Sequence, residues 1–342
     1  MSSLRPRWTR AAVVRLALLL GLGVAIVLAG ASLVGVEHVS LLRALRDPGS
    51  DDATILFRAR LPRVLLAALI GAALAPSGVA FQALLGNPLA DPYVLGVSGG
   101  AAAAGTAALV LFGAGGLSSA LVLPMSAFAG ALGAVALVLV FGRVRGVLVP
   151  TVALLAGVVL NALMSAIIVG IRVVARPSAA HEALYWLSGS IQPAQPIALL
   201  ALAIYVVVSL VVLQRNAVAM NALTIGGEAA EALGVDVART RRTIFLCASL
   251  LTGGAVALAG PIGFVGIVVP HTLRLLVGSD HRALLVASAL GGAVFLVFAD
   301  TLTRMSFLVI GVEPTVGVLT ALIGAPFFLV LLRQRGLGGA SL

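Results

Sequence analysis

Long apolar segments, separated by short polar stretches, run along nearly the whole chain. A segment of about 20 apolar residues is long enough to cross the hydrocarbon core of a membrane as an α-helix, and such segments recur about ten times. The predicted spans are Val13–Val36, Leu61–Leu85, Tyr93–Phe112, Leu121–Gly142, Thr151–Arg172, Pro196–Gln214, Thr243–Pro261, Gly263–Val277, Ala283–Thr303 and Thr315–Leu332. We therefore predict an all-α polytopic membrane protein that forms one transmembrane domain over residues 1–342.

The seventh and eighth spans form one apolar stretch that is far longer than a single crossing. The sequence Gly260-Pro261-Ile262-Gly263 lies inside this stretch. Proline lacks the N–H that a helix interior needs, and glycine adopts turn conformations freely. The chain is therefore predicted to reverse direction at these four residues.

The composition agrees with a membrane protein, because 61% of the 342 residues are hydrophobic and only 10% are charged. A soluble domain needs more charge to keep its surface hydrated. The net charge is +10, but the arginines separate apolar runs and form no single basic face, so we expect no nucleic-acid partner. Cys247 is the only cysteine, which excludes a disulfide framework and a thiol-based metal site.

The arginines also indicate the orientation. Basic residues are enriched in the cytoplasmic loops of membrane proteins. An even number of spans puts both termini on one side, and placing that side in the cytoplasm puts 14 of the 22 arginines there. These are Arg5, Arg7, Arg10, Arg15, Arg143, Arg145, Arg215, Arg239, Arg241, Arg242, Arg274, Arg282, Arg333 and Arg335. This orientation predicts a cytoplasmic loop at about residues 216–242 and an outer loop at about residues 37–60.

The N-terminal segment has a second interpretation. Basic residues, an apolar run and Ala29-Gly30-Ala31 resemble a cleavable signal peptide. The apolar run reaches Val36, however, which is longer than the usual core of a signal peptide. Its removal would also leave an odd number of spans. We therefore favour a first transmembrane helix.

The middle of the spans is nearly free of acidic and histidine side chains, which are the usual marks of ion coupling. Asp300 and Arg304 lie toward the outer end of the ninth span, and His271 lies in the inner half of the eighth. An ion-coupled secondary transporter, the first alternative class, needs more such groups. The chain also contains no lysine, which a phosphate-binding P-loop requires. Any ATP must therefore be hydrolysed on a separate chain.

A second alternative, an intramembrane serine hydrolase, depends on one short pattern. Gly96-Val97-Ser98-Gly99-Gly100 matches the G-x-S-x-G sequence of a serine nucleophile on a tight turn. The reaction also needs a general base within hydrogen-bond distance, usually a histidine. The chain has only four histidines, and three of them lie in predicted loops. Close helix packing through Gly96 and Gly100 explains the same residues.

The cytoplasmic loop contains a short amphipathic helix, Gly226–Gly234. Ala229, Ala232 and Leu233 share one face at i, i+3, i+4 spacing, and Glu228 near the helix start complements the helix dipole. Gly234 is suited to a left-handed C-terminal stop. A small apolar face of this kind fits a groove on a partner protein. The alternative is a helix on the inner membrane surface, but its acidic residues would be repelled by that anionic leaflet.

Two further segments of the sequence have a clear structural interpretation. Asn87 to Pro92 joins the second and third spans, and Asp91 followed by Pro92 is a good helix start. Arg60-Leu61-Pro62-Arg63 begins the second span at the outer face. Arginines in this position either anchor the helix at the membrane interface or bind a partner.

Together these residues resemble the FecCD-type permeases, the transmembrane subunits of type II ABC importers for iron–siderophore, haem and cobalamin. The resemblance extends from about Arg60 to Leu332. The segments that carry it are Arg60–Arg63, Gly71–Ala75, Asn87–Pro92, Leu95–Ser98, Leu155–Val158, Tyr185–Leu187 with Gly189, Gly226–Gly234, Ala259–Gly266, Val269–His271, Asp280–Arg282 and Gly317–Pro326.

The resemblance implies a permease in the bacterial cytoplasmic (inner) membrane, with ten spans and both termini in the cytoplasm. It implies a second permease copy, expected to be identical, two ATP-binding cassette ATPase subunits that bind ATP-Mg, and a periplasmic or lipid-anchored substrate-binding protein. The permease itself is expected to hold no cofactor or metal and to catalyse no reaction, and its other contact is membrane lipid. The expected cargo is a metal chelate, first an Fe(III)-siderophore and then cobalamin or haem, translocated by alternating access.

The resemblance also assigns roles to individual residues. The ATPase-coupling residues are Gly226, Gly227, Glu228, Ala229, Ala232, Leu233 and Gly234. Arg60, Arg63 and Arg304 correspond to outer-face arginines that pair with acidic residues of the binding protein, a geometry that suits the guanidinium group. Pro150 and Thr151 stand where relatives have a hydroxyl pair at the cytoplasmic gate, so only Thr151 keeps that chemical type.

Overall fold

The computed structural model describes residues 8–112 and 117–338, and its described residues are almost entirely helical. The elements up to the single hairpin are α1 (Arg10–Leu33), α2 (Leu41–Arg46), α3 (Asp51–Ala53), the π-helical η1 (Thr54–Arg60), α4 (Leu61–Leu85), the 3₁₀ helix η2 (Pro92–Leu95), α5 (Val97–Phe112), α6 (Leu117–Phe141), β1 (Arg143–Val144) and β2 (Val147–Leu148). The remaining elements are α7 (Pro150–Val174), α8 (Pro177–Leu187), α9 (Pro196–Arg215), α10 (Ala217–Leu223), α11 (Gly227–Ala232), α12 (Val237–Ala259), α13 (Val265–Val277), α14 (His281–Ile310) and α15 (Val316–Gly338).

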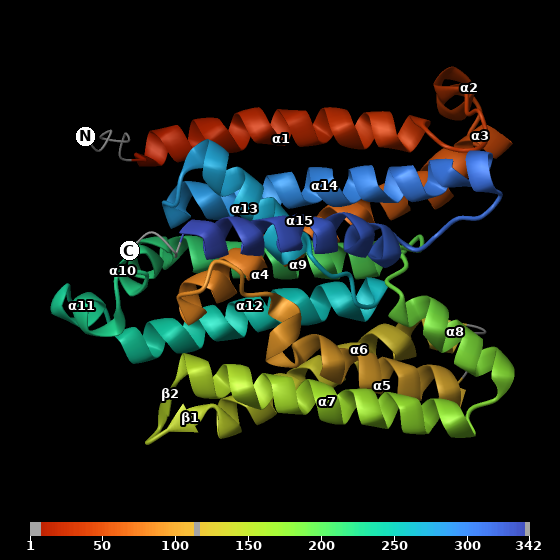
Figure 1. Ribbon diagram of the computed structural model, residues 1–342. Coiled ribbons are helices and arrows are strands. Elements are labelled where there is room, and N and C mark those ends of the chain that lie inside the picture. The colour runs from red at the N-terminus through yellow and green to blue at the C-terminus, as the bar shows by residue number, and fades with distance from the viewer. Residues whose placement is uncertain (1–7, 113–116, 339–342) are drawn as a thin grey trace.

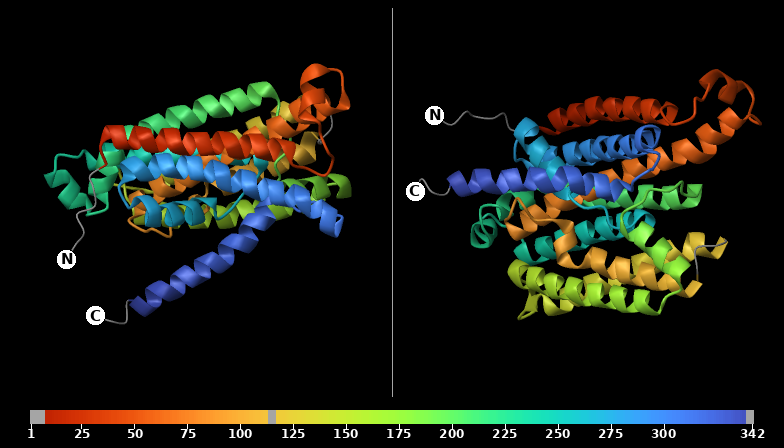
Figure 2. Two further views of the ribbon diagram at one scale, coloured as in Figure 1. Left: turned by 90° about the horizontal axis from the view of Figure 1, so that it is seen from above. Right: turned by 45° about the vertical axis from the view of Figure 1, so that its right-hand side comes forward.

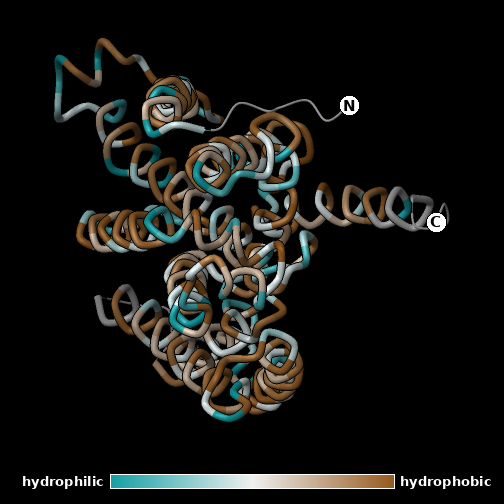
Figure 3. The backbone as a smooth tube through the Cα atoms, turned by 90° about the vertical axis from the view of Figure 1, so that its left-hand side faces the viewer, coloured by the Kyte–Doolittle hydropathy of each residue, from teal (hydrophilic) through white to brown (hydrophobic). Residues whose placement is uncertain are grey.

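The long helices lie roughly side by side in one bundle, with α2 and α3 at one end and α10 and α11 at the other (Figure 1). Helix α4 lies at the centre, where it contacts α14, α12, α13 and α9. A view along the bundle shows hydrophobic residues predominating on the helices, and it shows the C-terminal part of α15 projecting to one side (Figure 3). Figure 2 shows the same projection of α15 from two other directions.

The predicted number of spans agrees with the helices of the structure. In the described residues, seven helices are long and apolar enough to cross a membrane, and three shorter apolar helices accompany them, Val97–Phe112, Val265–Val277 and Val316–Leu331. The all-α polytopic fold is therefore confirmed. Arg5 and Arg7, which contribute to the predicted charge asymmetry, lie outside the described residues.

Several element boundaries differ from the prediction; for example, α14 continues to Ile310, past the predicted end at Thr303. The outer loop at about residues 37–60 is largely helical, because α3 and η1 continue directly into α4 as one helix over Asp51–Leu85. At the opposite end, α12 begins at Val237, six residues before the predicted start. The Asp236 side chain caps this helix by accepting a hydrogen bond from the backbone N–H of Arg239 at 2.9 Å. Hydropathy does not reveal such polar helical turns, because they lie outside the apolar stretch.

The predicted break between the seventh and eighth spans is present. Helix α12 ends at Ala259, Gly260 has φ +69°, and α13 begins at Val265. A Cβ at Gly260 would overlap the carbonyl oxygen of Trp186 in α8, so both the backbone angle and the space favour glycine here. The Tyr93 hydroxyl also accepts a hydrogen bond from the backbone N–H of Ile262, which ties the break to η2.

Small residues allow the two innermost helices to approach closely. Gly71 of α4 faces Gly292 of α14, and a Cβ added to either residue would overlap the carbonyl oxygen of the other. A Cβ at Gly78 of α4 would likewise overlap the carbonyl oxygen of Gly266 in α13, and a Cβ at Gly266 would meet the ring of Pro92. In a bilayer, where apolar residues have no preference for one another over lipid, close packing of this kind is a main source of helix association.

We expect Gly71→Ala to lower the free energy of unfolding by about 1–3 kcal/mol, because the added methyl group must push α4 away from α14. Gly133→Ala is the matched control, since a Cβ at Gly133 of α6 meets nothing within 4 Å. Thermal unfolding of the purified variants in detergent measures both effects. Equal midpoints for the two variants would contradict the tight α4–α14 contact.

Candidate functional site

The α11 segment, Gly226–Gly234, forms the end of the molecule opposite α2 (Figure 1). Gly226 has φ +135° and Gly234 has φ +81°, so glycine begins and ends this short helix, and the predicted left-handed stop at Gly234 is confirmed. Ala230, which was not predicted to contribute, is fully buried against the bundle. Ala232 and Leu233 are exposed, and Leu233 is 69% exposed. The apolar side of the segment is therefore available to a partner.

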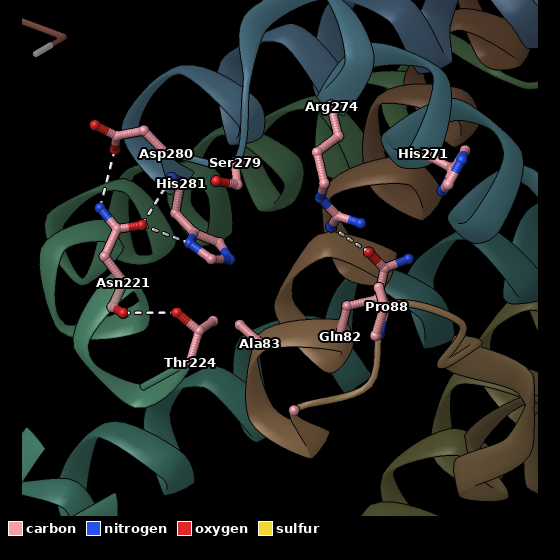
Figure 4. A pocket seen from close by; sticks show the side chains of 11 residues that line it. Gln82, Ala83, Pro88, Asn221, Thr224, His271, Arg274, Ser279, Asp280 and His281 are labelled. Atoms are coloured by element: carbon pink, nitrogen blue, oxygen red, sulfur yellow. Dashed lines mark hydrogen bonds between the residues drawn. The ribbon is translucent and has the colours of Figure 1, made fainter. Parts of the chain in front are cut away.

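A cavity of about 560 Å³ lies beside this segment, between α4, α10, α13 and α14 (Figure 4). Most of the residues that line it are polar, among them Gln82, Asn221, His271, Arg274 and His281. Gln82 of α4 contacts two parts of α13, because its Nε2 donates to the carbonyl oxygen of Gly266 and its Oε1 accepts from Arg274. The cavity therefore lies where polar side chains connect α4 to α13 and α10 to α14.

Asn221 joins α10 to the start of α14. Its Oδ1 accepts a hydrogen bond from the backbone N–H of His281 at 3.0 Å, and its Nδ2 donates to Asp280 Oδ1 at 3.0 Å. The His281 Nδ1 lies 2.6 Å from the same Asn221 oxygen. One amide side chain thus holds two consecutive residues at the N-terminus of α14, and α10 leads directly into the α11 segment.

The carboxylate of Asp280 is itself fixed. Burial raises the pKa of this carboxyl, but the hydrogen bonds from Arg282 and Asn221 outweigh burial and hold the pKa at about 2. The Arg282 guanidinium lies 2.6 Å from Asp280 Oδ2. Asp280 is therefore ionised at neutral pH and accepts hydrogen bonds from both neighbours.

On the sequence prediction that a separate ATPase drives transport through this chain, we expect Asn221→Ala to lower the number of cargo molecules transported per ATP hydrolysed by about fivefold or more, because it removes the hydrogen bonds between α10 and α14. Asn216→Ala is the matched control, since the hydrogen bond that the Asn216 side chain makes in the described part of the chain goes to Val212 O, in the helix that precedes it. The measurement is transport and ATP hydrolysis on the same proteoliposomes. An unchanged ratio of transported cargo to hydrolysed ATP would show that Asn221 does not couple α10 to α14.

At the opposite end, five charged residues form what we call the arginine network: Arg60, Arg63, Asp300, Arg304 and Glu313. Asp300 is fully buried and lies 2.8 Å from Arg63 and 3.2 Å from Arg304. Arg63 also pairs with Glu313, which lies in the loop before α15. One carboxylate therefore neutralises guanidinium groups from both α4 and α14.

The other contacts of the arginine network hold the C-terminal end of α1. Arg304 donates to the carbonyl oxygens of Val34 at 3.0 Å and Ala31 at 3.1 Å. Arg60 donates to the carbonyl oxygen of Leu33 at 3.0 Å and to that of Glu37. The last carbonyls of a helix have no partners within the helix, so these two guanidinium groups satisfy them.

This geometry bears on the predicted docking residues. Arg60 and Arg304 are only 8% and 7% exposed, and their donors are directed at α1. Arg63 and Glu313 retain more exposed side-chain surface, 15% and 36%. The arginines lie together at the predicted outer end, but as an internal network. Their contact with a binding protein stays a prediction. Asp300 and Arg304 are four residues apart in α14, a spacing that favours an ion pair within a helix. The sequence prediction did not use this signal.

The other predicted sites also have defined positions. Pro150 and Thr151 form the first turn of α7, directly after the β1–β2 hairpin and at the same end as the α11 segment (Figure 1). Their role as a gate stays a prediction. Asp91 caps η2 as expected, accepting from the backbone N–H of Tyr93 at 2.8 Å. Among the described residues, no group of three or more histidine, cysteine or acidic residues is placed to hold a metal ion.

The G-x-S-x-G pattern is explained by packing. Ser98 lies in the first turn of α5 and is 4% exposed. A Cβ at Gly100 would overlap the carbonyl oxygen of Gly130 in α6, and Gly130 faces Gly100 in return. Gly100 thus serves the α5–α6 contact, and a Cβ at Gly96 or Gly99 would meet Gly157 or Asn161 of α7, so close helix packing accounts for the pattern.

Comparison with known proteins defines the class. A solved structure described as an inward-facing conformation of a metal-chelate type ABC transporter superposes on 93% of this chain and 99% of its own, with a TM-score of 0.78 and 30% sequence identity. The bundle is therefore that of a type II ABC importer permease, a transport component rather than an enzyme.

The sequence comparisons define the family. The model of the FecCD transport family matches residues 14–334, and the chain belongs to this family. A cobalamin import system permease protein, BtuC of Halobacterium salinarum, is 45% identical over 81% of this chain and 72% of its own length. The hemin transport system permease protein HmuU of Yersinia pestis is 39% identical over 86% of this chain and 88% of its own. Members of the family work with an ATPase and a binding protein.

Proposed function

We propose that this chain translocates a metal chelate across the cytoplasmic membrane by alternating access, driven by separate ATPase subunits. The observation that carries the proposal is the α11 segment, which exposes Ala232 and Leu233 and is joined to a central helix through Asn221. A segment that both receives a partner and contacts a membrane-spanning helix is suited to transmitting motion. No reaction in this chain is needed for that role.

The expected ATPase contact is the exposed side of the α11 segment. ATP-Mg binds to the ATPase subunits, and their closure displaces α11 together with α10. The hydrogen bonds from Asn221 to Asp280 and His281 then pass the displacement to α14. Because α14 packs on α4 through glycine, the two helices slide with few side chains in the way.

We propose an orientation of the chain that its charges support. Arg215, Arg239, Arg241, Arg242 and Arg282 lie near the α11 end. The acidic residues Asp47, Asp51, Asp52, Asp300 and Glu313 lie at the other end. Positive charge favours the cytoplasm, so we place the α11 segment, Pro150 and Thr151 inside and the arginine network outside.

The arginine network is the proposed docking platform for the substrate-binding protein. Arg60 and Arg304 bind the end of α1. Arg63 is the arginine whose guanidinium group is partly exposed, and it pairs with Glu313. A carboxylate of the binding protein would pair with Arg63 by displacing Glu313. This gives Arg60 and Arg304 an indirect part in docking, because they hold the platform in place.

A second permease copy is proposed to cover the projecting helix. Helix α15 leaves the bundle at an angle (Figure 2) and exposes Leu322, Leu329 and Val330. Helix α7 likewise exposes Val159, Val173 and Val174. An identical chain is the simplest partner, since it would bring the same two helices to a shared axis.

The cargo class is supported by the relatives, which are named for cobalamin, hemin and ferric enterobactin. All three are bulky metal chelates. A ferric siderophore remains the first expectation from the sequence, and cobalamin and haem are tested beside it.

The test is uptake by proteoliposomes that contain the permease, its ATPase and its binding protein. Each of the three chelates is offered on the binding-protein side, with ATP or ADP on the other. We expect ATP-dependent accumulation of one chelate class. ATP-independent accumulation, or none of any chelate when the binding protein is loaded, would contradict the proposal.

A further inference from the structure

Helix α2 has an apolar side that is largely exposed in the described part of the chain. Leu41, Leu42 and Leu45 are 44%, 67% and 63% exposed. At about 100° per residue, these three leucines lie within an arc of about 100°. Ala44 lies outside this arc, about 60° from Leu41, and is buried against Ala53 and Leu56. The helix thus packs on the protein through Ala44, with Arg43 4.0 Å from Asp52 of α3, and it exposes its three leucines.

The position of α2 indicates what covers these leucines. Figure 1 places α2 beyond the C-terminal end of α1 and to the side of the bundle. The left view of Figure 2 shows α2 on the opposite side of the bundle from the projecting part of α15. The bundle therefore does not lie beneath α2. Lipid surrounds the outer surface of a transmembrane bundle, and α2 stands over that region.

The neighbouring helix α1 has a long exposed apolar surface of the kind that faces lipid. Helix α1 exposes Leu18, Leu22 and Ile26 along its length, and none of its membrane-spanning window is buried in the protein. Exposed apolar residues continue past the end of α1 through Val34 and Val36 into α2. The leucines of α2 thus extend the lipid-facing side of α1 to the membrane surface.

The charges of α2 fit the same location. Arg46 lies beside the leucine arc, next to Leu42, whereas Arg43 lies on the opposite side of α2, 72% exposed and 4.0 Å from Asp52 of α3. A helix with leucines on one side, an arginine at the edge and a charged opposite side lies in the plane of the membrane interface, where the edge arginine reaches lipid phosphates. This surface suits an acidic binding protein less well than lipid. Asp47, Asp51 and Asp52 follow α2 in the sequence, so only one end of the surface is positively charged.

We propose that α2 is an interfacial helix that binds the lipid surface at the end of the bundle where α1 ends. Leu41, Leu42 and Leu45 insert at the boundary between headgroups and acyl chains, Arg46 contacts phosphates, and Arg43 faces water beside Asp52. Because α2 packs on Ala53 and Leu56, and that segment leads through η1 to Arg60, the lipid contact holds the arginine network at a fixed depth. The proposal does not depend on the cargo or the ATPase.

The experiment measures membrane depth directly. Cys247 is the only cysteine, so Cys247→Ala provides a cysteine-free background whose folding is checked by gel filtration. A nitroxide is attached at Leu42→Cys or Leu45→Cys in the full-length chain, in nanodiscs of phosphatidylethanolamine and phosphatidylglycerol. Collision rates with oxygen, which partitions into lipid, and with the water-soluble complex NiEDDA are then compared.

We expect labels at positions 42 and 45 to collide several-fold more with oxygen than with NiEDDA, as does a control label at Leu22→Cys on the lipid side of α1. A label at Asp51→Cys, exposed in the same outer segment, should show the reverse. NiEDDA accessibility at 42 and 45 equal to that at 51 would overturn the proposal. Loss of NiEDDA accessibility only after binding protein is added would overturn it too, and would assign α2 to that protein instead.

Discussion

Replacing Asp300 with alanine is expected to lower the free energy of unfolding by about 3–5 kcal/mol. Asp300 is fully buried and is the shared partner of Arg63 and Arg304, at 2.8 Å and 3.2 Å. Without it, two guanidinium groups remain in a region of low dielectric with no full counter-charge. Unfolding by denaturant or heat in detergent, followed by size-exclusion fluorescence, measures the loss.

Glu313→Gln is the matched control for this experiment. Glu313 pairs with the same Arg63, but the Glu313 side chain is 36% exposed. Water can therefore solvate the Arg63 guanidinium when the Glu313 charge is removed. Its removal should change the free energy of unfolding by about 1 kcal/mol or less. If Asp300→Ala is no more destabilising than Glu313→Gln, then the arginine network is not the internal ion pair that the distances indicate.

The second large effect is expected at the α11 segment. Leu233→Glu should reduce ATP-driven transport by about 30-fold or more. This is the factor that corresponds to about 2 kcal/mol, the size of a central contact at a protein–protein interface, here the interface between α11 and the ATPase. The fold should be unaffected, because Leu233 is 69% exposed and its side chain supports little of the bundle. Co-purification of the ATPase and transport by proteoliposomes are measured on the same preparation.

Glu231→Gln serves as the control in the same helix. Glu231 is also exposed but lies on a different side of α11 from Ala229, Ala232 and Leu233. It should leave ATPase association and transport close to those of the unchanged protein. Normal ATPase association by Leu233→Glu would show that the partner contacts another surface.

Much of this fold was predictable because the membrane imposes a simple rule. Each crossing needs about 20 apolar residues, so hydropathy located the spans from Val13 to Leu332. The same rule does not show where helices extend beyond the bilayer. Asp236 begins α12 before its apolar part, and Ser50 accepts from the N–H of Ala53 where α3 begins. Those starts depend on polar caps outside the apolar stretch.

The functional residues were predictable to a smaller extent. Glycine at positions 226 and 234 marked the α11 segment, because its backbone angles suit few other residues. Asn221 has no such signal, since an asparagine in a loop has many possible partners and only the fold brings it to Asp280. The arginines were predicted as outward contacts. That contact stays a prediction. Within the chain, Arg63 pairs with Asp300 and Glu313, whereas Arg60 and Arg304 donate to backbone carbonyl oxygens at the end of α1, which no sequence pattern identifies.

The central claim is that this permease is a passive, gated path operated by a separate ATPase. The most direct test reconstitutes it with its ATPase and binding protein, and measures cargo uptake while an ionophore removes every ion gradient. We predict that uptake continues and requires ATP. If the permease alone concentrates its cargo from an imposed ion gradient, without ATPase or ATP, the claim is contradicted.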